Sequence, residues 1–412
     1  LSFGCFVCAS LLETSGSGPP LTQPLVSSQH TLRSISPVPA PGRLSDFGTF
    51  VRERRCYAPG LTAICFPQGC VRPHIDSAVM NMSSSEPIEP APSDTLEEDE
   101  FEGSDYGESL ASSGFTSLAS RVMRHSHEGG RRYQSFLQGI YPLPNDETEQ
   151  FREEMKHQLV KRLLEENDYL SPIGSNPQKI MDVGTGTGLW AVDVADKFPS
   201  AHVIGVDISP IQNCYAPQNV DWRVDDIQET WSPLYSDLDF VHLRSVSVTL
   251  REPVRVIHSA YENLKPGGWI EFQDAGVRIG CDDNTLPEDY APVKFMDTFI
   301  RTFKTHFGWD LEFPNVLPEV LKDAGFVNIH YRCYKLPIGP WAKDRQQREI
   351  GLFLSKDVLW QLVRAVLVKW PQMGLTKQEA DTMEHDIRKA FENTSYHAYL
   401  PWISVWAQKP PN

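Results

Sequence analysis

The run Met181-Asp182-Val183-Gly184-Thr185-Gly186-Thr187-Gly188 carries the clearest chemical pattern in the sequence. An acidic residue ends an apolar stretch, and three glycines follow at every second position. Because glycine has no Cβ, the backbone can turn sharply there and a ligand can approach it closely. The pattern predicts a loop at the carboxyl end of a strand that binds a nucleotide-like ligand.

Further acidic residues end the next two apolar runs. Asp207 ends the first run and lies 19 residues beyond Gly188, near the spacing of an acid that holds ribose hydroxyls. Asp225 and Asp226 end the second run, and a carboxylate there can accept a hydrogen bond from an adenine amino group, while the backbone N–H of Ile227 reaches a ring nitrogen. Because parallel strands end at one edge of a sheet, these acids are expected to converge on one site.

Two kinds of ligand fit such a loop. The stretch Gly186-Thr187-Gly188-Leu189-Trp190-Ala191 matches the G-x-G-x-x-A form of a dinucleotide loop, which predicts NAD or FAD. The alternative is S-adenosylmethionine. A pyrophosphate is anionic, so Asp182 would repel it, whereas a positive sulfur and an ammonium group are stabilised by nearby carboxylates. We therefore favour S-adenosyl-L-methionine as the cofactor and keep an NAD-dependent oxidoreductase as the alternative.

The elements that must position these residues alternate between strands and helices. Strands are predicted at Lys179–Val183, His202–Asp207, Val220–Val224, Leu238–Arg244 and Gly268–Ala275. Helices are predicted between them at Leu189–Phe198, near Gln228–Trp231 and at Pro253–Leu264. The alternation predicts an α/β fold, a Rossmann-like and mostly parallel sheet with helices on both faces.

The regions before and after this core are also predicted to be ordered. A helix is expected at Glu147–Asp168, capped by Asp146 or Thr148, with an apolar face formed by Phe151, Met155, Leu159, Leu163 and Leu164. After the fifth strand, helices are expected at Glu288–Phe307 and Val316–Ala324, a strand at Phe326–Tyr331, helices at residues 345–369 and 376–392, and a last strand at Tyr396–Ala407. A helical insert, residues 343–392, therefore separates the last two of seven strands.

The N-terminal region, residues 1–115, has a different composition. Residues 1–79 are rich in Ser, Pro and Gly, and residues 80–119 hold ten acidic side chains and no basic one. Such segments cannot bury enough apolar area to offset the chain entropy, so disorder is expected. The sequence opens on Leu1, and we interpret Met80 or Met82 as the translation start.

Composition excludes several classes of function. The formal net charge is −16, which argues against binding a phosphate backbone, so no direct nucleic-acid partner is expected. No apolar stretch approaches 18 residues, so no membrane span is expected. The eight cysteines and the histidines show no metal-ligand spacing, so no metal is expected. Scattered cysteines favour a reducing, intracellular compartment.

Together the motifs resemble the class I S-adenosylmethionine-dependent methyltransferases, and more narrowly the fungal LaeA-like secondary-metabolite methyltransferases. The matching stretches are Tyr141 to Glu147, Asp182 to Trp190, Val203 to Gln212, Asp239 to Arg244 and Leu264 to Glu271. The resemblance covers residues 116–410, which are expected to form the methyltransferase domain, and it leaves residues 1–115 outside.

The resemblance implies roles for the residues of the loop and the strand ends. It implies that Asp182, Gly184, Thr185, Gly186 and Gly188 hold the methionine end of the cofactor, that Asp207 holds the ribose, and that Asp225, Asp226 and Ile227 hold the adenine. Arg244 and Tyr133 are further cofactor-binding candidates, since the segment at Arg132 and Tyr133 precedes the first helix and is placed to act as a lid.

Catalytic residues are less clearly marked. His242 alternates with Arg244 along the fourth strand, and His157 lies on the first helix, so these histidines are weak candidates for a general base. The resemblance implies methyl transfer to an oxygen or nitrogen of a small molecule in fungal secondary metabolism. The alternative is a nuclear regulator of secondary metabolism that acts through protein partners. The methyl acceptor and the oligomeric state are not predicted.

Overall fold

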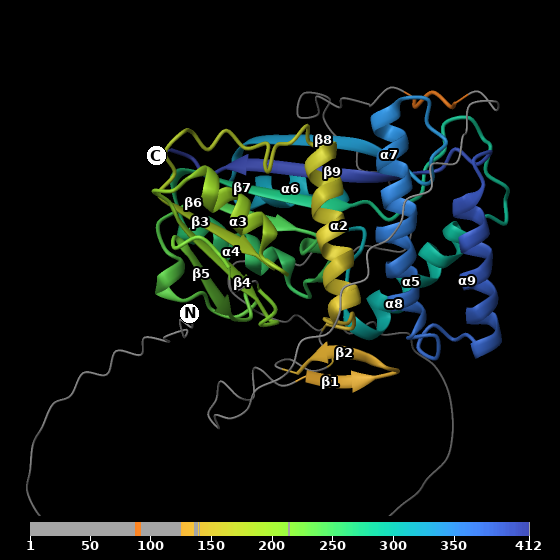
Figure 1. Cartoon of the computed structure of the whole chain (residues 1–412). Coiled ribbons are helices and arrows are strands. Elements are labelled where there is room, and N and C mark those ends of the chain that lie inside the picture. Colours follow the sequence, from red (N-terminus) through yellow and green to blue (C-terminus); the bar gives the residue numbers. More distant parts are fainter. Residues whose placement is uncertain (1–86, 92–124, 136–138, 140, 213–214, 412) are drawn as a thin grey trace, which may run out of the picture. The chain divides into compact units, whose positions relative to one another are not determined.

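The computed structural model describes residues 87–91, 125–135, 139, 141–212 and 215–411. All of these residues lie in one compact unit, Arg72–Asn412 (Figure 1). The predictions for residues 1–86 and 92–115, including the translation start, fall outside the described residues.

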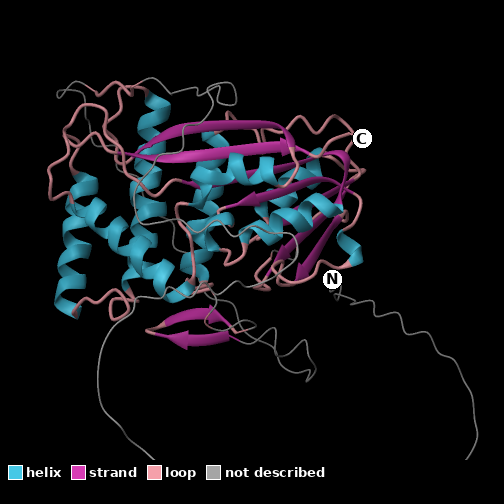
Figure 2. Ribbon diagram, turned by 180° about the vertical axis from the view of Figure 1, so that it is seen from behind, coloured by secondary structure: helices cyan, strands magenta, loops and turns pink. Residues whose placement is uncertain are grey.

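A seven-stranded sheet lies at the centre of this unit, in the order β5-β4-β3-β6-β7-β9-β8 (Figures 1 and 2). The first five strands in this order pair in parallel, and β9 is antiparallel to both β7 and β8. The strands are β3 (Lys179–Val183), β4 (His202–Asp207), β5 (Val220–Val224), β6 (Leu238–Arg244), β7 (Leu264–Ala275), β8 (Val327–Pro337) and β9 (Tyr399–Gln408). The predicted fold class, a mostly parallel seven-stranded α/β sheet, is confirmed.

Helices cover both faces of the sheet because its central strands are apolar on both sides. Helix α3 (Leu189–Lys197) places Trp190 and Val194 in a core with Phe240 of β6. Helices α4 (Pro253–Asn263) and α6 (Leu317–Asp323) belong to a second core with β3, β6 and β7. Residues buried on both faces are typical of parallel strands, which explains their nearly continuous hydrophobic sequence.

Three local predictions were wrong, and the first concerns the helix after Asp146, α2 (Glu147–Leu163), which ends at Leu163 rather than at the predicted Asp168. Residues Gln228–Trp231 form a turn rather than a helix, and a short 3₁₀ turn, η1 (Pro233–Tyr235), follows. A helix that began at Gln228 could not continue past Pro233, because proline lacks an N–H and its ring clashes with the preceding turn. Strand β7 begins at Leu264, four residues earlier than predicted, because Leu264 pairs with Leu238 before the register shifts.

The insert between β8 and β9 is helical, as predicted. It consists of α7 (Arg345–Phe353), a π-helical turn η4 (Leu354–Leu359), α8 (Trp360–Leu367) and α9 (Lys377–Glu392). With α5 (Ala291–Phe307) and α2 (Glu147–Leu163), these helices enclose the largest hydrophobic core of the described residues. Helix α2 stands between the sheet and the insert helices (Figure 1).

Helix α2 differs in part from its predicted amphipathic pattern. Asp146 caps it by accepting a hydrogen bond from the Glu149 amide at 3.1 Å, as predicted. Leu159 is buried as expected, but Phe151 is 47% exposed. The helix instead buries a charged face, with Glu149, Arg152 and His157 nearly inaccessible. That face points toward the cavities described below.

Two short segments before α2 were not predicted. Strands β1 (His125–Glu128) and β2 (Arg131–Gln134) form a hairpin, and Arg131 binds the carboxylate of Asp146 through two nitrogens at 2.5 and 2.9 Å. Within the region predicted to be disordered, residues 87–91 are described, and Pro90 pairs with Ala342 as an isolated bridge.

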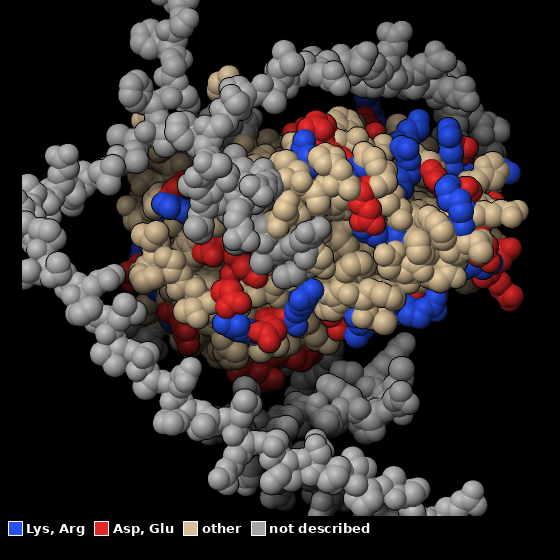
Figure 3. Space-filling model, turned by 90° about the horizontal axis from the view of Figure 1, so that it is seen from below, with Lys and Arg blue, Asp and Glu red and all other residues tan. Residues whose placement is uncertain are grey.

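The surface of the unit mixes charges of both signs. On the face seen from below, Lys and Arg lie among Asp and Glu (Figure 3). Among the helices of the described residues, none has the length and apolar content needed to cross a bilayer.

One buried carboxylate ties the segment after α2 to the middle of the sheet. Glu271 of β7 is fully buried and accepts hydrogen bonds from the amides of Leu170 and Ser171, at 2.9 and 2.8 Å, and from the Ser171 hydroxyl at 2.7 Å. The side chain of Gln273 donates a further bond at 2.8 Å. A charge buried among four donors is stabilised only while those donors remain in place.

We therefore predict that Glu271→Ala lowers the free energy of unfolding by about 3 kcal/mol, because it leaves several buried donors without an acceptor. Guanidinium denaturation followed by circular dichroism measures this change. The matched control is Glu229→Ala, whose carboxylate is 75% exposed and 3.9 Å from Arg255; its expected effect is within about 0.5 kcal/mol. Equal losses for the two variants would contradict the assigned role.

Candidate functional site

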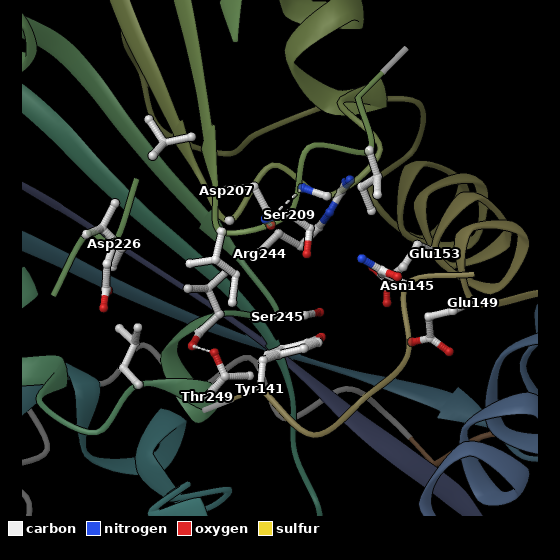
Figure 4. A pocket seen from close by; sticks show the side chains of 18 of the residues that line it. Tyr141, Asn145, Glu149, Glu153, Asp207, Ser209, Asp226, Arg244, Ser245 and Thr249 are labelled. Atoms are coloured by element: carbon white, nitrogen blue, oxygen red, sulfur yellow. Dashed lines mark hydrogen bonds between the residues drawn. The ribbon is translucent and has the colours of Figure 1, made fainter. Parts of the chain in front are cut away.

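A cavity with about 1030 Å³ of free space, partly open to solvent, lies at the carboxyl ends of β3 to β6. Its walls come from the glycine loop after β3, the ends of β4, β5 and β6, and helix α2. In Figure 4, Asp226 lies at one end, Glu149 and Glu153 of α2 lie at the other, and Asp207 lies between them. We call this space the strand-end cavity.

The glycine loop forms its floor with backbone that other residues would strain. Gly184 has φ +67°, and a Cβ there would lie 2.3 Å from Val246. Gly186 has φ +58° with open space on the side where a Cβ would point. Both glycines line the cavity, so a ligand can lie directly against the main chain.

Asp207 is held rigidly by backbone amides. Its Oδ2 accepts from the Gly186 amide at 2.9 Å, and its Oδ1 accepts from the Ser209 amide at 2.8 Å. Burial raises the pKa of Asp207 to about 6, against the opposing effect of these amides. Each oxygen keeps a second lone pair, so the carboxylate can still accept from a pair of ligand hydroxyls.

The acids at the end of β5 occupy the far end of the cavity. Asp225 accepts from the Tyr235 hydroxyl at 2.9 Å, and Asp226 accepts from the Gln228 amide at 3.0 Å. Both residues and Ile227 line the cavity together with the apolar side chains Ile208 and Leu250. A flat apolar group that carries hydrogen-bond donors on its edge fits this arrangement.

The opposite end holds polar groups without partners among the described residues. Glu149 Oε2 and Asn145 Nδ2 are buried there and make no hydrogen bond. Arg244 also lines the cavity and has no carboxylate within 4 Å in the described chain. Burial lowers the pKa of its guanidinium. A group with one positive and one negative charge would satisfy all three side chains.

His157 positions Arg244 rather than lining the cavity. Arg244 Nη2 donates to His157 Nδ1 at 2.9 Å, so Nδ1 must be the unprotonated nitrogen. His157 Nε2 then donates to Asp193, 3.1 Å away. Burial lowers the pKa of His157, which keeps the ring neutral. The sequence marked His157 as a weak candidate for a general base, but its side chain does not line the strand-end cavity.

Asp182 and His242 form a buried pair beneath the glycine loop. Asp182 Oδ1 lies 2.8 Å from His242 Nδ1, and Asp182 Oδ2 accepts from the Thr185 hydroxyl at 2.6 Å. The imidazole stacks on Trp190 with ring centres 3.7 Å apart. Neither Asp182, Thr185 nor His242 lines the strand-end cavity. The pair therefore supports the loop from below, and His242 is not placed to act on a bound ligand.

Two other predicted residues also lie away from the cavity. Gly188, with φ +88°, begins α3 and packs against Trp222. Tyr133 of β2 lies beneath the Lys369 ammonium, 4.7 Å from it, and burial raises its pKa to about 12. The structure thus brings together Gly184, Gly186, Asp207, Asp225, Asp226, Ile227 and Arg244, and it leaves Asp182, Thr185, Gly188, Tyr133, His157 and His242 outside the lining.

Sequence reasoning missed the charged face of α2. Arg152 contacts both Glu149 and Glu153, and Lys156 lies 2.5 Å from Glu153. Burial raises the pKa of Glu153, but Lys156 and Arg152 outweigh it and lower the pKa to about 2, so this carboxylate is ionised. The spacing i, i+3 and i+4 of these charges was a readable signal, because such residues share one helix face.

A second cavity adjoins the first. It holds about 900 Å³ of free space, also partly open, and shares Tyr141, Glu153, Lys156, Ser245 and Thr249 with the strand-end cavity. The rest of its wall is mainly aliphatic and aromatic and comes from α5, the insert, β8 and β9. We call it the apolar chamber. Two ligands bound in the two cavities would meet at the shared residues.

A family model described as a methyltransferase domain matches residues 151–331. Methyltransferase pytC of Aspergillus terreus is 32% identical over 297 residues, which is 72% of this chain and 91% of pytC. Secondary metabolism regulator LAE1 of Cochliobolus heterostrophus is 30% identical over 69% of this chain and 94% of LAE1. Probable methyltransferase tdiE of Emericella nidulans is 30% identical over 71% of this chain and 92% of tdiE.

The two kinds of acid in the site are expected to respond differently to truncation. Asp182→Ala leaves a buried histidine and a hydroxyl without their acceptor, so we predict a loss of about 3 kcal/mol in the free energy of unfolding. Asp226→Ala removes a partly exposed carboxylate with one backbone partner, so a loss below about 1 kcal/mol is expected. Guanidinium denaturation of both variants tests this order, and a reversed order would contradict it.

Proposed function

Because this chain belongs to the S-adenosylmethionine-dependent methyltransferases related to fungal pytC, tdiE and LAE1, we propose that it methylates a small molecule of fungal secondary metabolism. The observation that carries the proposal is the junction of two cavities, one with groups that suit a nucleoside and an amino acid, the other apolar. We assign the activity to residues 116–410.

The nucleoside half of S-adenosyl-L-methionine fits the acidic strand ends. Asp207 would accept the two ribose hydroxyls, in keeping with its central place in the cavity (Figure 4). Asp226 would accept from the adenine amino group, the Ile227 amide would donate to the ring, and Ile208 and Leu250 would enclose the base. Gly184 and Gly186 leave the main chain accessible for this contact.

The amino-acid half fits the opposite end. The ammonium group would lie against Glu149, whose Oε2 is an unpaired buried acceptor. The carboxylate of the cofactor would lie against Arg244 and the Asn145 amide. Arg244 has no carboxylate partner among the described residues, and the Asn145 nitrogen has no acceptor there. His157 holds Arg244 for this contact. In this assignment Asp182, Thr185 and Gly188 do not contact the cofactor but shape the loop that does. Tyr133 likewise does not contact it and belongs to the hairpin before α2.

When bound, the cofactor supplies an electrophilic methyl group attached to a positive sulfur. The residues of the chain align an acceptor with that group and exclude water, which can account for about 7–11 kcal/mol of the barrier. The acidic wall formed by Glu149, Glu153 and Asp207 favours the cationic cofactor. The same wall disfavours a pyrophosphate, so an NAD-dependent oxidoreductase is the weaker candidate.

A regulatory function is the second candidate, because LAE1 and its relatives are named as secondary metabolism regulators. It requires protein partners in the nucleus rather than a metabolite acceptor. The apolar chamber favours the enzyme, since a regulator that acts through surface contacts has no need of a second cavity beside the cofactor.

We predict that the full chain, incubated with methyl-labelled S-adenosylmethionine and a fungal metabolite extract, transfers label to at least one small molecule. Chromatography with mass spectrometry identifies the product as a mass gain of one methyl group. Asp207→Ala is the control and should reduce labelling at least tenfold through weaker cofactor binding. Binding of S-adenosylhomocysteine without any labelled metabolite would favour the regulator, and binding of NADH alone would favour the oxidoreductase.

The raised pKa of Asp207 predicts how cofactor affinity depends on pH. The ionised carboxylate accepts the ribose hydroxyls, and the free protein binds a proton there below about pH 6. Below that value the affinity for S-adenosylhomocysteine should therefore fall, approaching tenfold per pH unit, while it stays constant at neutral pH. Calorimetry between about pH 5 and 7.5 measures it. Asp207→Asn should bind more weakly and lose this dependence; an unchanged pH profile in that variant would contradict the assignment.

A further inference from the structure

The apolar chamber contains one carboxylate that the cofactor site does not use. Asp274 lies near the end of β7, lines the chamber and is fully buried. Its Oδ2 accepts from the Ser247 hydroxyl at 2.7 Å, whereas its Oδ1 has no hydrogen-bond partner among the described residues. A buried carboxylate oxygen without a donor is unfavourable, so this position suits a donor brought by a ligand.

Two donors in the same chamber are also unpaired. The indole nitrogens of Trp309 and Trp402 are buried and have no acceptor within the described chain. Both tryptophans line the chamber, together with Phe299 and several leucines. Among the residues that line the chamber, the buried polar atoms without a partner are thus one acceptor, on Asp274, and two donors, on the tryptophans. A ring compound that carries a hydroxyl and oxygen acceptors complements such a set.

The other charged groups of the chamber are already paired with one another. Arg152, Glu153 and Lys156 of α2 form one network, and Tyr141 lies just before that helix. The side chains from α5, β8, β9 and the insert that line the chamber are uncharged. The Lys156 ammonium acts on Asp274 electrostatically but forms its ion pair with Glu153, 2.5 Å away. The Asp274 carboxylate is therefore the base in the chamber that is not committed to an ion pair.

We propose that the apolar chamber binds a phenol with an extended apolar ring system, and that Asp274 accepts the proton of its hydroxyl group during methyl transfer. This inference rests on the proposed function and names the acceptor class and a catalytic residue for it. A phenol is favoured over an aliphatic alcohol because a carboxylate is a weak base and needs an acidic hydroxyl.

The step balances without a further reactant. The phenol oxygen forms a bond to the methyl carbon while its proton passes to Asp274 Oδ1. The electron pair of the broken carbon–sulfur bond stays on the sulfur, which becomes a neutral thioether. The products are an aryl methyl ether and a protonated carboxyl group, which returns its proton to water when the product leaves.

The electrostatic surroundings of Asp274 suit this role. Burial raises its pKa to about 7, while the Ser247 hydroxyl, the Lys156 ammonium and the amides of Val246 and Ser247 act in the opposite direction. The group is therefore ionised above about pH 7 and neutral below it. Loss of the Ser247 hydroxyl should move this midpoint upward, since a hydrogen bond that favours the ionised form would be removed.

Binding of 2-naphthol and of its methyl ether to the full chain tests the inference directly. Titration calorimetry with saturating S-adenosylhomocysteine, from about pH 5.5 to 8.5, keeps the naphthol hydroxyl protonated. The wild-type chain should bind 2-naphthol about tenfold more tightly than 2-methoxynaphthalene at the alkaline end, because only the naphthol donates to the carboxylate. This preference should decline toward pH 6 with a midpoint near the pKa of Asp274, about 7.

Variants separate a chemical role from a structural one. Asp274→Asn should abolish the pH-dependent preference, and Ser247→Ala should keep it with a midpoint at higher pH. The matched control is Asp357→Asn, a half-buried carboxyl on η4 with a raised pKa that lines neither cavity; it should behave as wild type. Affinity for S-adenosylhomocysteine, measured in the same samples, should stay unchanged in all three and reports that the fold is intact.

Each remaining outcome has a defined meaning. A preference that persists in Asp274→Asn, or a midpoint that does not move in Ser247→Ala, overturns the assignment of Asp274. A wild-type chain that binds S-adenosylhomocysteine but neither naphthalene compound overturns the phenol chamber and leaves the proposed methyltransferase function standing. A chain that binds no S-adenosylhomocysteine overturns the proposed function itself.

Discussion

Both cavities depend on how carboxylates are held at the carboxyl ends of the strands. Asp182, Asp207, Asp226 and Asp274 end or nearly end β3, β4, β5 and β7. Asp182 and Asp207 each have one hydrogen-bond partner on each oxygen: the side chains of His242 and Thr185 for Asp182, and the amides of Gly186 and Ser209 for Asp207. Asp274 has one oxygen unpaired among the described residues. Position relative to the cavities separates these acids: Asp182 lies outside both linings and supports the loop, whereas Asp207, Asp226 and Asp274 each line a cavity.

Helix α2 places four charged side chains between the two cavities. Glu149, Arg152, Glu153 and Lys156 neutralise one another along one face, so the helix can remain buried between the sheet and the insert. Isolated, any of these ions would carry a large desolvation cost. As a network they form a polar partition: Glu149 lines the strand-end cavity, Arg152 lines the apolar chamber, and Glu153 and Lys156 line both. The partition explains why one helix can contribute to both cavities.

The sequence predicted the sheet and the cofactor edge because both depend on local patterns. Alternating apolar runs, glycines and acids are read within about 30 residues, and the relatives confirm the methyltransferase resemblance. Neither histidine that was a weak catalytic candidate lines a cavity, and the sequence could not show this, because alternation along β6 gives the direction of His242 but not the stacking on Trp190 that buries it. Phe151 was misplaced for a related reason: only the tertiary structure reveals that the buried face of α2 is charged.

The apolar chamber was beyond prediction because its wall has no local signature. Residues from α2, α5, β8, β9 and the insert meet there from positions more than 200 residues apart, and each reads in isolation as ordinary core. Yet Asp274 obeys the same rule that marked Asp182 and Asp207, an acid at the end of an apolar strand, and could have been flagged by it. The two cavities therefore differ in how the sequence encodes them. The glycine loop and the acids around it come from short motifs at one edge of the sheet, whereas the apolar chamber takes its wall from several elements, including the insert.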